Sequence, residues 1–242
     1  MILSRNNIED IADIITSDFN LFCGVKDDPK RVLPRKAPID RFASDYLNLE
    51  VSYARLSSDG SICGMTAYED TEYVCKIDGV PHVLPLKRNQ VVLDASYIRP
   101  GREEMQYGSR RFTLAHECAH QILYQMESNA GGTACRRRYV KCRCTDLRDL
   151  GGARNWTEWQ ANALGAALLM PRHEMDLAMS LLAPGRTLSA FGGRIPHGDE
   201  NCIRLMKRIF GVSRTALIIR LRNLDMLTDR PWSEYADPAE VS

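Results

Sequence analysis

The sequence lacks the features that mark several large classes of protein. Its 242 residues carry 32 Lys and Arg against 31 Asp and Glu, a net charge of +1, so bulk charge gives no reason to expect binding to nucleic acid or membranes. No apolar run approaches the roughly 18 residues that a membrane-spanning helix requires. A composition of 44% hydrophobic and 26% charged residues excludes a disordered or fibrous chain. These absences leave a globular domain with a small appendage, or two small domains.

Cysteine is also sparse for a protein held together by disulfides. The chain has 8 cysteines, of which Cys135, Cys142 and Cys144 lie close together. The first residues interrupt their apolar positions with charges such as Glu9 and Asp10, so they lack the apolar stretch of a secretory signal. We therefore predict a cytoplasmic protein with reduced thiols. The spacing of the clustered cysteines matches no usual zinc motif, which favours ordinary loop thiols over a structural metal site.

Hydrophobic periodicity divides the sequence into a strand-rich first part and a helical second part. An amphipathic helix is predicted at the start, where Ile8, Ile11 and Ile15 have helical spacing. A proline-containing loop and a short helix are expected next, at residues 27–38 and 42–47. Alternating residues then predict a β-hairpin, with further strands extending its sheet; the expected strands are residues 51–56, 62–68, 74–77, 83–86 and 91–94. Helices are predicted over residues 110–126, 157–170, 201–210 and 213–227.

The placement of histidine gives the strongest functional signal. Only 5 histidines occur, and two of them, His116 and His120, enclose a glutamate in the sequence HECAH. This spacing on a helix projects both imidazoles from one face, where they can reach one metal ion. Glu117 can then act as general base toward a water molecule at that metal. Packed or solvated histidines are the alternative, which the apolar surroundings of the motif disfavour because buried imidazoles without partners are costly.

A catalytic zinc ion needs three protein ligands, and the third is expected to be a carboxylate. The other histidines lie in loop-like or poorly placed positions: His82, His173 and His197. Glu158 is the best candidate because it opens a helix whose small residues permit close approach to another helix. These small residues are Ala161, Gly165 and Ala166. The competing carboxylates lack such helical support: Asp146, Asp149 and Glu174.

Two further residues near these ligands have predicted roles. Asn162 stands one helical turn after Glu158 on the same face, where it can hydrogen-bond a ligand imidazole and orient it. Cys118 lies in the interior of the HECAH helix, and we predict that it is a small packed residue rather than a redox or metal-inhibitory thiol. The residue that stabilises an oxyanion is left open among Tyr124, Tyr139 and His173.

Residues 110–123, RRFTLAHECAHQIL, and residues 158–171, EWQANALGAALLMP, together resemble the ImmA/IrrE family of metallo-endopeptidases. The family pattern is an RFTxAHExxH helix followed by an ExxANxFAxxLLMP helix, and weaker similarity extends from about residue 38 to residue 227. This chain departs from the pattern at three positions, none of them a ligand. Leu164 and Gly165 replace Phe and Ala, and Cys118 replaces an aliphatic residue.

The resemblance implies a zinc peptidase of the thermolysin-like (gluzincin) kind. It assigns one zinc ion to His116, His120 and Glu158, with Glu117 as catalytic base. Family members cleave or help to inactivate DNA-binding repressors in mobile-element or stress regulation. The expected partner is therefore a protein substrate such as a helix-turn-helix repressor.

The predicted fold is α+β, with a small antiparallel or mixed sheet, a helical zincin-like active-site region and a C-terminal helical subdomain resembling a helix-turn-helix. We expect an N-terminal helix and proline-containing loop over residues 1–37, a zinc metallopeptidase domain over residues 38–175, and a helical subdomain over residues 176–242 packed on it. An exposed strand edge could bind an extended substrate by strand addition.

Two alternative functions come from other features. Residues 201–230 contain seven Lys and Arg against two Asp, a local charge of +5, and Ser213, Arg214 and Thr215 would open the recognition helix of a DNA-binding motif. The apolar residues of the same helices suit them equally to a core. A second basic stretch, residues 136–148, reads as a solvated loop that could border the cleft. The other alternative is a zinc-binding regulator that sequesters a repressor without cutting it.

Overall fold

The computed structural model of the protein describes residues 2–25, 28, 30–101, 103–129, 138–143 and 156–235. It confirms the predicted α+β fold. The helices are α1 (Arg5–Phe22), α2 (Ile39–Arg41), α3 (Glu103–Asn129), α4 (Trp156–Leu169), α5 (Arg172–Leu182), α6 (His197–Phe210) and α7 (Arg214–Asn223). The strands are β1 (Glu50–Ala54), β2 (Ile62–Ala67), β3 (Thr71–Ile77), β4 (Val80–Leu86), β5 (Gln90–Asp94), β6 (Tyr139–Arg143), β7 (Leu188–Phe191) and β8 (Leu227–Arg230).

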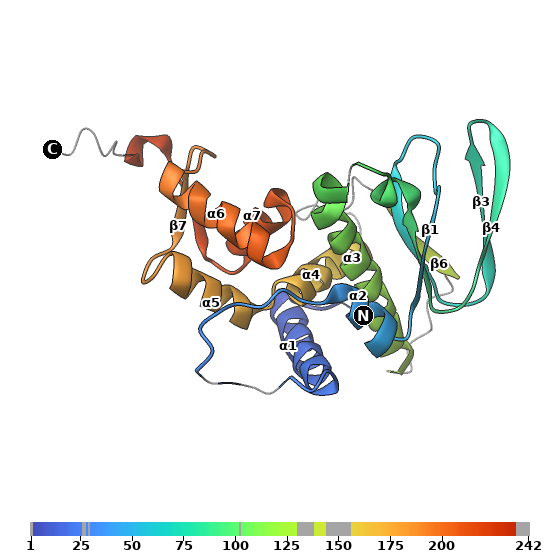
Figure 1. Ribbon diagram of the computed structural model, residues 1–242, viewed down its shortest axis with the longest axis horizontal. Coiled ribbons are helices and arrows are strands. Elements are labelled where there is room, and N and C mark those ends of the chain that lie inside the picture. The colour runs from blue at the N-terminus through green and yellow to red at the C-terminus, as the bar shows by residue number, and fades with distance from the viewer. Residues whose placement is uncertain are drawn as a thin grey trace.

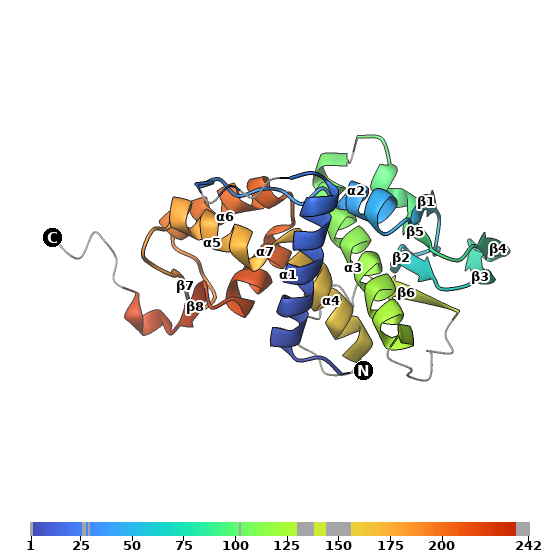
Figure 2. The ribbon, with the colours of Figure 1, turned by 90° about the horizontal axis from the view of Figure 1, so that it is seen from below.

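The main elements form three neighbouring groups. Figures 1 and 2 show strands β1–β6 at one end of the molecule, α5–α7 at the other, and α1, α3 and α4 between them. A π-helical turn over Phe42–Tyr46 and 3-10 turns over Ala95–Ile98 and Trp232–Glu234 complete the regular structure that is described. No helix in the described part of the chain combines the length and the apolarity needed to cross a membrane.

The larger sheet has the strand order β1-β5-β2-β6, so the predicted hairpin between residues 51–56 and 62–68 is wrong. Strand β5 lies between the two segments, parallel to β1 and antiparallel to β2. Its apolar run Val91–Leu93 is fully buried, whereas β1 is only half-buried. Because a central strand is covered on both faces, the more apolar strand occupies the centre and β1 lies at the edge. The chain after β1 therefore does not form a hairpin with β2, because β5 lies between the two strands.

The strands predicted near residues 74–77 and 83–86 do not extend that sheet. They form a separate two-stranded sheet, β3–β4. Its turn places Asp78 and Gly79 at φ of 52° and 83°, the left-handed conformation that a tight two-residue hairpin turn requires. The local turn closes β3 on β4, and much of β4 is solvent-exposed.

The last predicted helix, residues 213–227, is too long. α7 ends at Asn223, Asp225 has a φ of 58°, and Leu227 begins β8, which pairs in parallel with β7. The apolar residues Leu224, Met226 and Leu227 continue the pattern of the helix, but the left-handed residue between them ends it. These side chains are still buried, now beside a strand rather than in the helix.

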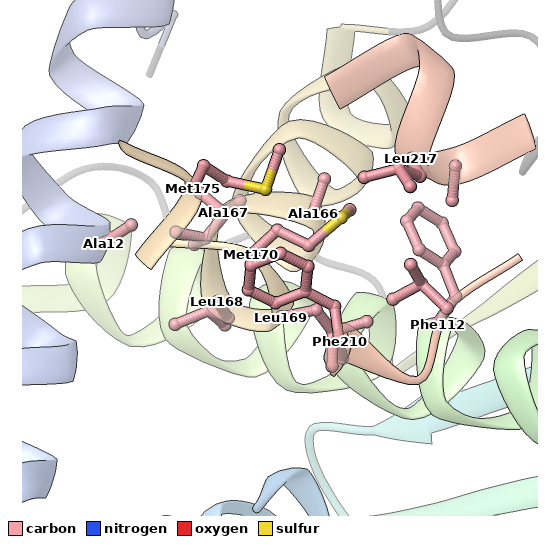
Figure 3. Packing of buried hydrophobic residues seen from close by; sticks show 14 of the residues in the cluster. Ala12, Phe112, Ala166, Ala167, Leu168, Leu169, Met170, Met175, Phe210 and Leu217 are labelled. Atoms are coloured by element: carbon pink, nitrogen blue, oxygen red, sulfur yellow. The ribbon is translucent and has the colours of Figure 1, made fainter. Parts of the chain in front are cut away.

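One buried core joins the helices of all three predicted parts of the chain. Figure 3 shows Ala12 of α1, Phe112 of α3, Leu169 of α4, Phe210 of α6 and Leu217 of α7 in this cluster. The predicted boundary between residues 175 and 176 falls inside α5. The division into domains stays a prediction.

A buried ion pair also connects these helices. The guanidinium of Arg220 on α7 donates to both carboxylate oxygens of Glu9 on α1, with Nη2 2.8 Å from Oε2, and its Nε donates to the Met170 carbonyl 3.0 Å away. The side chains of Arg220 and Glu9 are only 2% and 9% exposed. The first and last long helices are thereby fixed to the end of α4.

Candidate metal centre

α3 and α4 bring the three predicted ligands together. His116 and His120 lie one turn apart on α3, and their Nε2 atoms are 3.0 Å apart. Oε2 of Glu158, in the first turn of α4, lies 3.2 Å from Nε2 of His116 and 3.4 Å from Nε2 of His120. Both histidines are buried and Glu158 is 8% exposed. This compact set of two imidazoles and a carboxylate can bind a metal ion.

Asn162 fixes the orientation of one imidazole. Its Oδ1 lies 2.9 Å from Nδ1 of His116, and an amide oxygen can only accept a hydrogen bond, so Nδ1 carries the hydrogen. When the ring is neutral, the lone pair of His116 is therefore on Nε2, the atom that faces His120 and Glu158. Asn162 is 1% exposed and stands one turn after Glu158, so a single face of α4 presents both residues.

The close contact between α3 and α4 depends on Gly165. A Cβ atom at this position would lie 3.0 Å from the backbone nitrogen of His116 and 3.1 Å from the carbonyl carbon of Ala115. Ala161 and Ala166, the other small residues singled out in the sequence, are also buried. Such short side chains let the backbone of α4 reach the backbone of the histidine-bearing helix.

The electrostatic environment of the cluster favours positive charge. Burial by itself lowers the pKa of His116, but the hydrogen bond with Glu158, the nearby Glu117 and the Asn162 amide outweigh it, so the pKa is raised. Burial by itself raises the pKa of Glu158, and the two imidazoles beside it outweigh that effect, so the pKa lies below its usual range. A carboxylate held ionised between two imidazoles suits a bound cation.

Glu117 is fully buried beside the cluster, and its two carboxylate oxygens have no hydrogen-bond partner among the described residues. Burial, with a smaller contribution from Glu158, raises the pKa of Glu117 to about 8, although His116 lowers it. A buried carboxyl of this kind is an exception in folded proteins and is more typical of functional sites than of ordinary cores.

Strand β2 reaches this carboxylate at Gly64. A Cβ atom there would lie 2.7 Å from Oε1 of Glu117 and 2.7 Å from Cγ2 of Thr113. Gln121 ties the same strand to α3, because its Nε2 donates to Oγ1 of Thr66 at 2.7 Å and to the carbonyl of Ala67 at 2.9 Å. Gly64 was not among the predicted site residues, although an isolated glycine in a strand pattern indicates a bulge or a close backbone approach.

Of the described cysteines, Cys63, Cys118, Cys142 and Cys202 are buried, whereas Cys23 and Cys75 are half-buried. Cys118 is buried in α3, where burial raises the pKa of its thiol. Cys142 is not a loop residue as predicted: Tyr139–Arg143 pair with β2 as strand β6, in which Val140 and Cys142 are buried and Lys141 is exposed. Its Sγ lies within 4.8 Å of a ring nitrogen of His116 and a carboxylate oxygen of Glu117. Cys135 and Cys144 lie outside the described residues.

Several other candidates are accounted for elsewhere. Glu174 accepts hydrogen bonds from both terminal guanidinium nitrogens of Arg31, and His173 lies 3.2 Å from Nη2 of the same arginine. Tyr124 stacks on Tyr68 with ring centroids 4.0 Å apart. Two of the competing carboxylates and three arginines of the basic stretch 136–148 lie outside the described residues: Asp146, Asp149, Arg136, Arg137 and Arg148. Tyr139 opens β6 and packs edge-on against the ring of Tyr73.

Three arginines of the predicted recognition helix form ion pairs with acidic residues of the protein. Arg214 pairs with Glu200 at 2.6 Å, Arg222 pairs with Asp229 at 2.7 Å, and Arg220 is buried against α1. Ser213 accepts a hydrogen bond from the Ala216 nitrogen and so caps α7. Together these contacts give the α6–α7 pair a structural role within the fold.

The turn between α6 and α7 is also packed against α3. A Cβ atom at Gly108 would lie 2.7 Å from the backbone nitrogen of Ser213, and Nε of Arg111 donates to the Gly211 carbonyl at 3.1 Å. Gly211 itself has a φ of 62° and ends α6 in the left-handed conformation. The turn is thus fixed to the helix that carries His116 and His120.

Comparison with known proteins adds no family assignment. A scan against family models finds no match for this chain, and a search of curated proteins finds no significant match. The resemblance to the ImmA/IrrE family therefore rests on the two motifs, which stand on α3 and α4. Membership of that family stays a prediction.

Proposed function

We propose that the protein is a zinc-dependent endopeptidase, as the resemblance to the ImmA/IrrE family implies, and that it hydrolyses a peptide bond in a protein such as a helix-turn-helix repressor. The observation that carries this proposal is the meeting of His116, His120 and Glu158 at mutual distances of 3.0 to 3.4 Å, beside a buried glutamate. Two imidazoles and one glutamate are the ligand set of thermolysin-type catalytic zinc.

The distances between the three donor atoms fit a tetrahedral ion. Zinc bonds of about 2.0–2.2 Å to nitrogen and oxygen place neighbouring ligand atoms of a tetrahedron roughly 3.3–3.6 Å apart. The separations in this cluster, 3.0, 3.2 and 3.4 Å, are close to that range. With three protein donors, a fourth position is left for a water molecule or a substrate oxygen, which distinguishes a catalytic from a structural site.

The residues around the cluster supply the rest of the chemistry. Zinc bound there would polarise the scissile carbonyl and increase the acidity of a water molecule. Glu117 takes the proton from the attacking water and passes it to the leaving amine. Asn162 holds the His116 ring in the orientation that presents Nε2, and Gly64 lets β2 lie directly against the Glu117 carboxylate.

Strand β6 is the best candidate for the substrate-binding edge. Among the described strands it pairs only with β2, and Cys142 within it lies near Glu117. An extended peptide that added to this edge would place its backbone amides along the glutamate and the metal ligands. Backbone pairing of this kind binds a peptide with little demand on its sequence, which suits a protease that selects its target by a larger surface.

Cleavage of a repressor tests the proposal. The purified protein, loaded with zinc, is incubated with a helix-turn-helix repressor encoded beside it, with and without a chelator, and the products are identified by mass spectrometry. We expect zinc-dependent cleavage, and we expect Glu117→Gln to retain zinc while the rate falls about 100- to 10,000-fold. Full activity of Glu117→Gln on the same substrate would show that the mechanism is wrong.

The two alternatives predict different results, the first of them in the same experiment. A regulator that sequesters the repressor binds it and leaves it intact in both the wild type and Glu117→Gln. Direct DNA binding is less well supported, because Arg214, Arg220 and Arg222 have acidic partners within the protein. A salt-dependent shift of duplex DNA by the purified protein would favour it.

A further inference from the structure

Cys63 and Cys142 face each other across the β2–β6 pair. Their Sγ atoms are 3.6 Å apart, and both side chains are buried, 2% and 0% exposed. The register explains the contact: Ile62 pairs with Arg143 and Gly64 pairs with Cys142, so Cys63 is the additional residue of a β-bulge. Because two residues of a bulged strand oppose one residue of its partner, Cys63 stands beside Cys142.

This thiol pair is in contact with the proposed catalytic machinery. The Sγ of Cys142 lies within 4.8 Å of a Glu117 carboxylate oxygen and a His116 ring nitrogen. On the opposite strand, Cys63 directly precedes Gly64, whose missing side chain makes room for Oε1 of Glu117. The two thiols therefore flank the segment of β2 against which the Glu117 carboxylate is packed.

We propose that Cys63 and Cys142 form an oxidisable pair, a modification site for peroxides, and that its reversible disulfide changes the position of Glu117. The first part is independent of the proposed function. The second rests on the proposed role of Glu117 in hydrolysis. Together they make the peptidase responsive to oxidant through residues outside the proposed zinc ligand set of His116, His120 and Glu158.

The reaction balances with one molecule of peroxide. One thiol attacks hydrogen peroxide, becomes a sulfenic acid and releases water; the second thiol attacks the sulfenic sulfur and releases a second water as the disulfide forms. The two cysteines lose two electrons and two protons, and the peroxide gains them. A dithiol reductant reverses the change by thiol–disulfide exchange.

The contact of the two sulfur atoms permits this bond with a small movement. Cys63 is the bulge residue beside the directly paired Gly64 and Cys142, and its side chain already meets that of Cys142. The bond requires a sulfur separation of about 2.05 Å, so the two sulfur atoms, 3.6 Å apart, must approach each other by roughly 1.5 Å. Gly64 lies next to the moving residue, so the surface that contacts Glu117 moves with it.

Peptide mapping tests the site directly. The reduced, zinc-loaded full chain is exposed to hydrogen peroxide, remaining thiols are blocked with N-ethylmaleimide, and the digest is searched for the peptide containing Cys63 linked to that containing Cys142. We expect this link as the main product, removed by dithiothreitol. Alkylation of both cysteines after oxidation, or links of either to another cysteine as the main product, would overturn the proposal.

Two control variants keep the assignment specific. In Cys135→Ser/Cys144→Ser the link between Cys63 and Cys142 is expected to form as in the wild type. Cys202 is a matched control, because it is also a buried thiol but lies on α6, where its Sγ is 3.1 Å from the Leu182 carbonyl. Cys202→Ala should leave the link unchanged, and Cys63→Ala should abolish it. A link that is lost in either control would contradict the pairing.

The consequence for Glu117 has its own readout. If reduced wild type cleaves its substrate, the oxidised form should be about 100-fold slower, as expected for a catalytic group displaced by about 1 Å, and reduction should restore the rate. Zinc content should stay constant, and Cys63→Ala should be insensitive to peroxide. Equal rates before and after complete linkage, or loss of zinc on linkage, would refute the effect on Glu117. A reduced enzyme with no activity would count against the proposed function instead, while peptide mapping still decides the thiol pair.

Discussion

Gly165 of α4 lies against the backbone of His116 so closely that an added Cβ atom would be 3.0 Å from the His116 nitrogen. A larger side chain must therefore separate α4 from α3, and Glu158 moves with α4. We expect Gly165→Val to destabilise the protein by about 1–3 kcal/mol through overpacking and to weaken zinc binding. Denaturant unfolding and zinc titration measure the two effects. Gly198→Ala is the control, because nothing lies within 4 Å of a Cβ at that helical position; equal losses in both variants would contradict this explanation.

Gly64→Ala should separate metal binding from catalysis. The new methyl group would be 2.7 Å from Oε1 of Glu117, whereas none of the three metal ligands is among the nearest atoms. We expect zinc affinity close to that of the wild type and hydrolysis reduced about 100-fold, as for a misplaced catalytic group. Zinc content and the rate on a cleaved substrate are measured on the same sample. Loss of zinc in parallel with activity would show that the strand supports the ligands instead.

Asn162→Ala should weaken zinc binding by about 10- to 100-fold, because it removes the hydrogen bond to Nδ1 of His116. Competition with a chromophoric chelator gives the affinity. Gln160 offers a matched control on the same helix, a buried amide whose Oε1 accepts a hydrogen bond from the Leu3 nitrogen. Gln160→Ala should leave zinc affinity unchanged, and equal loss in both variants would indicate a general disturbance of α4.

Removal of the metal should lower thermal stability. An ion that binds only the folded state stabilises it by about 2.7 kcal/mol when its free concentration is 100 times its Kd. We expect the Tm to rise with added zinc and to fall with a chelator. The shift should disappear in His116→Ala/His120→Ala, in which two of the three donors are absent. A zinc-dependent shift that persisted in this double variant would place the ion elsewhere.

Arg220→Ala should be among the most destabilising substitutions, because it leaves the carboxylate of Glu9 buried without its guanidinium partner. Removal of one member of a buried ion pair costs about 3–5 kcal/mol. The exposed pair formed by Arg222 and Asp229 is the control, and Arg222→Ala should cost less than about 1 kcal/mol. Urea unfolding of the three proteins measures the difference. Similar values for the two variants would mean that the buried pair contributes no more than a surface contact.

Features that depend on the spacing of residues within one helix were predicted well from the sequence. The positions of His116 and His120 follow from helical geometry alone, and the small residue Gly165 indicated that a second helix would approach them. The α+β class followed from the change of period along the chain. These signals lie within one helix or between two helices with strong motifs.

Non-local pairing was not predictable in the same way. The insertion of β5 between β1 and β2 depends on which strand is buried on both faces. The alternation of apolar and polar residues within one segment does not show this. The end of α7 depends on the left-handed Asp225, an acidic residue in an otherwise helical pattern. The contact of Cys63 with Cys142 joins residues 79 positions apart through a bulge, and the spacing of the clustered cysteines gave no indication of it.

The bond between Arg220 and Glu9 has a consequence for synthesis of the protein. These residues are 211 positions apart, so α1 leaves the ribosome long before its partner is made. Until α7 emerges, the Glu9 carboxylate has no guanidinium to accompany its burial and the Met170 carbonyl lacks its donor. All three zinc donors are already present in such a nascent chain, but the helix that carries Glu158 is not yet fixed to α1 and α7. We therefore expect tight zinc binding only once α7 has joined the fold.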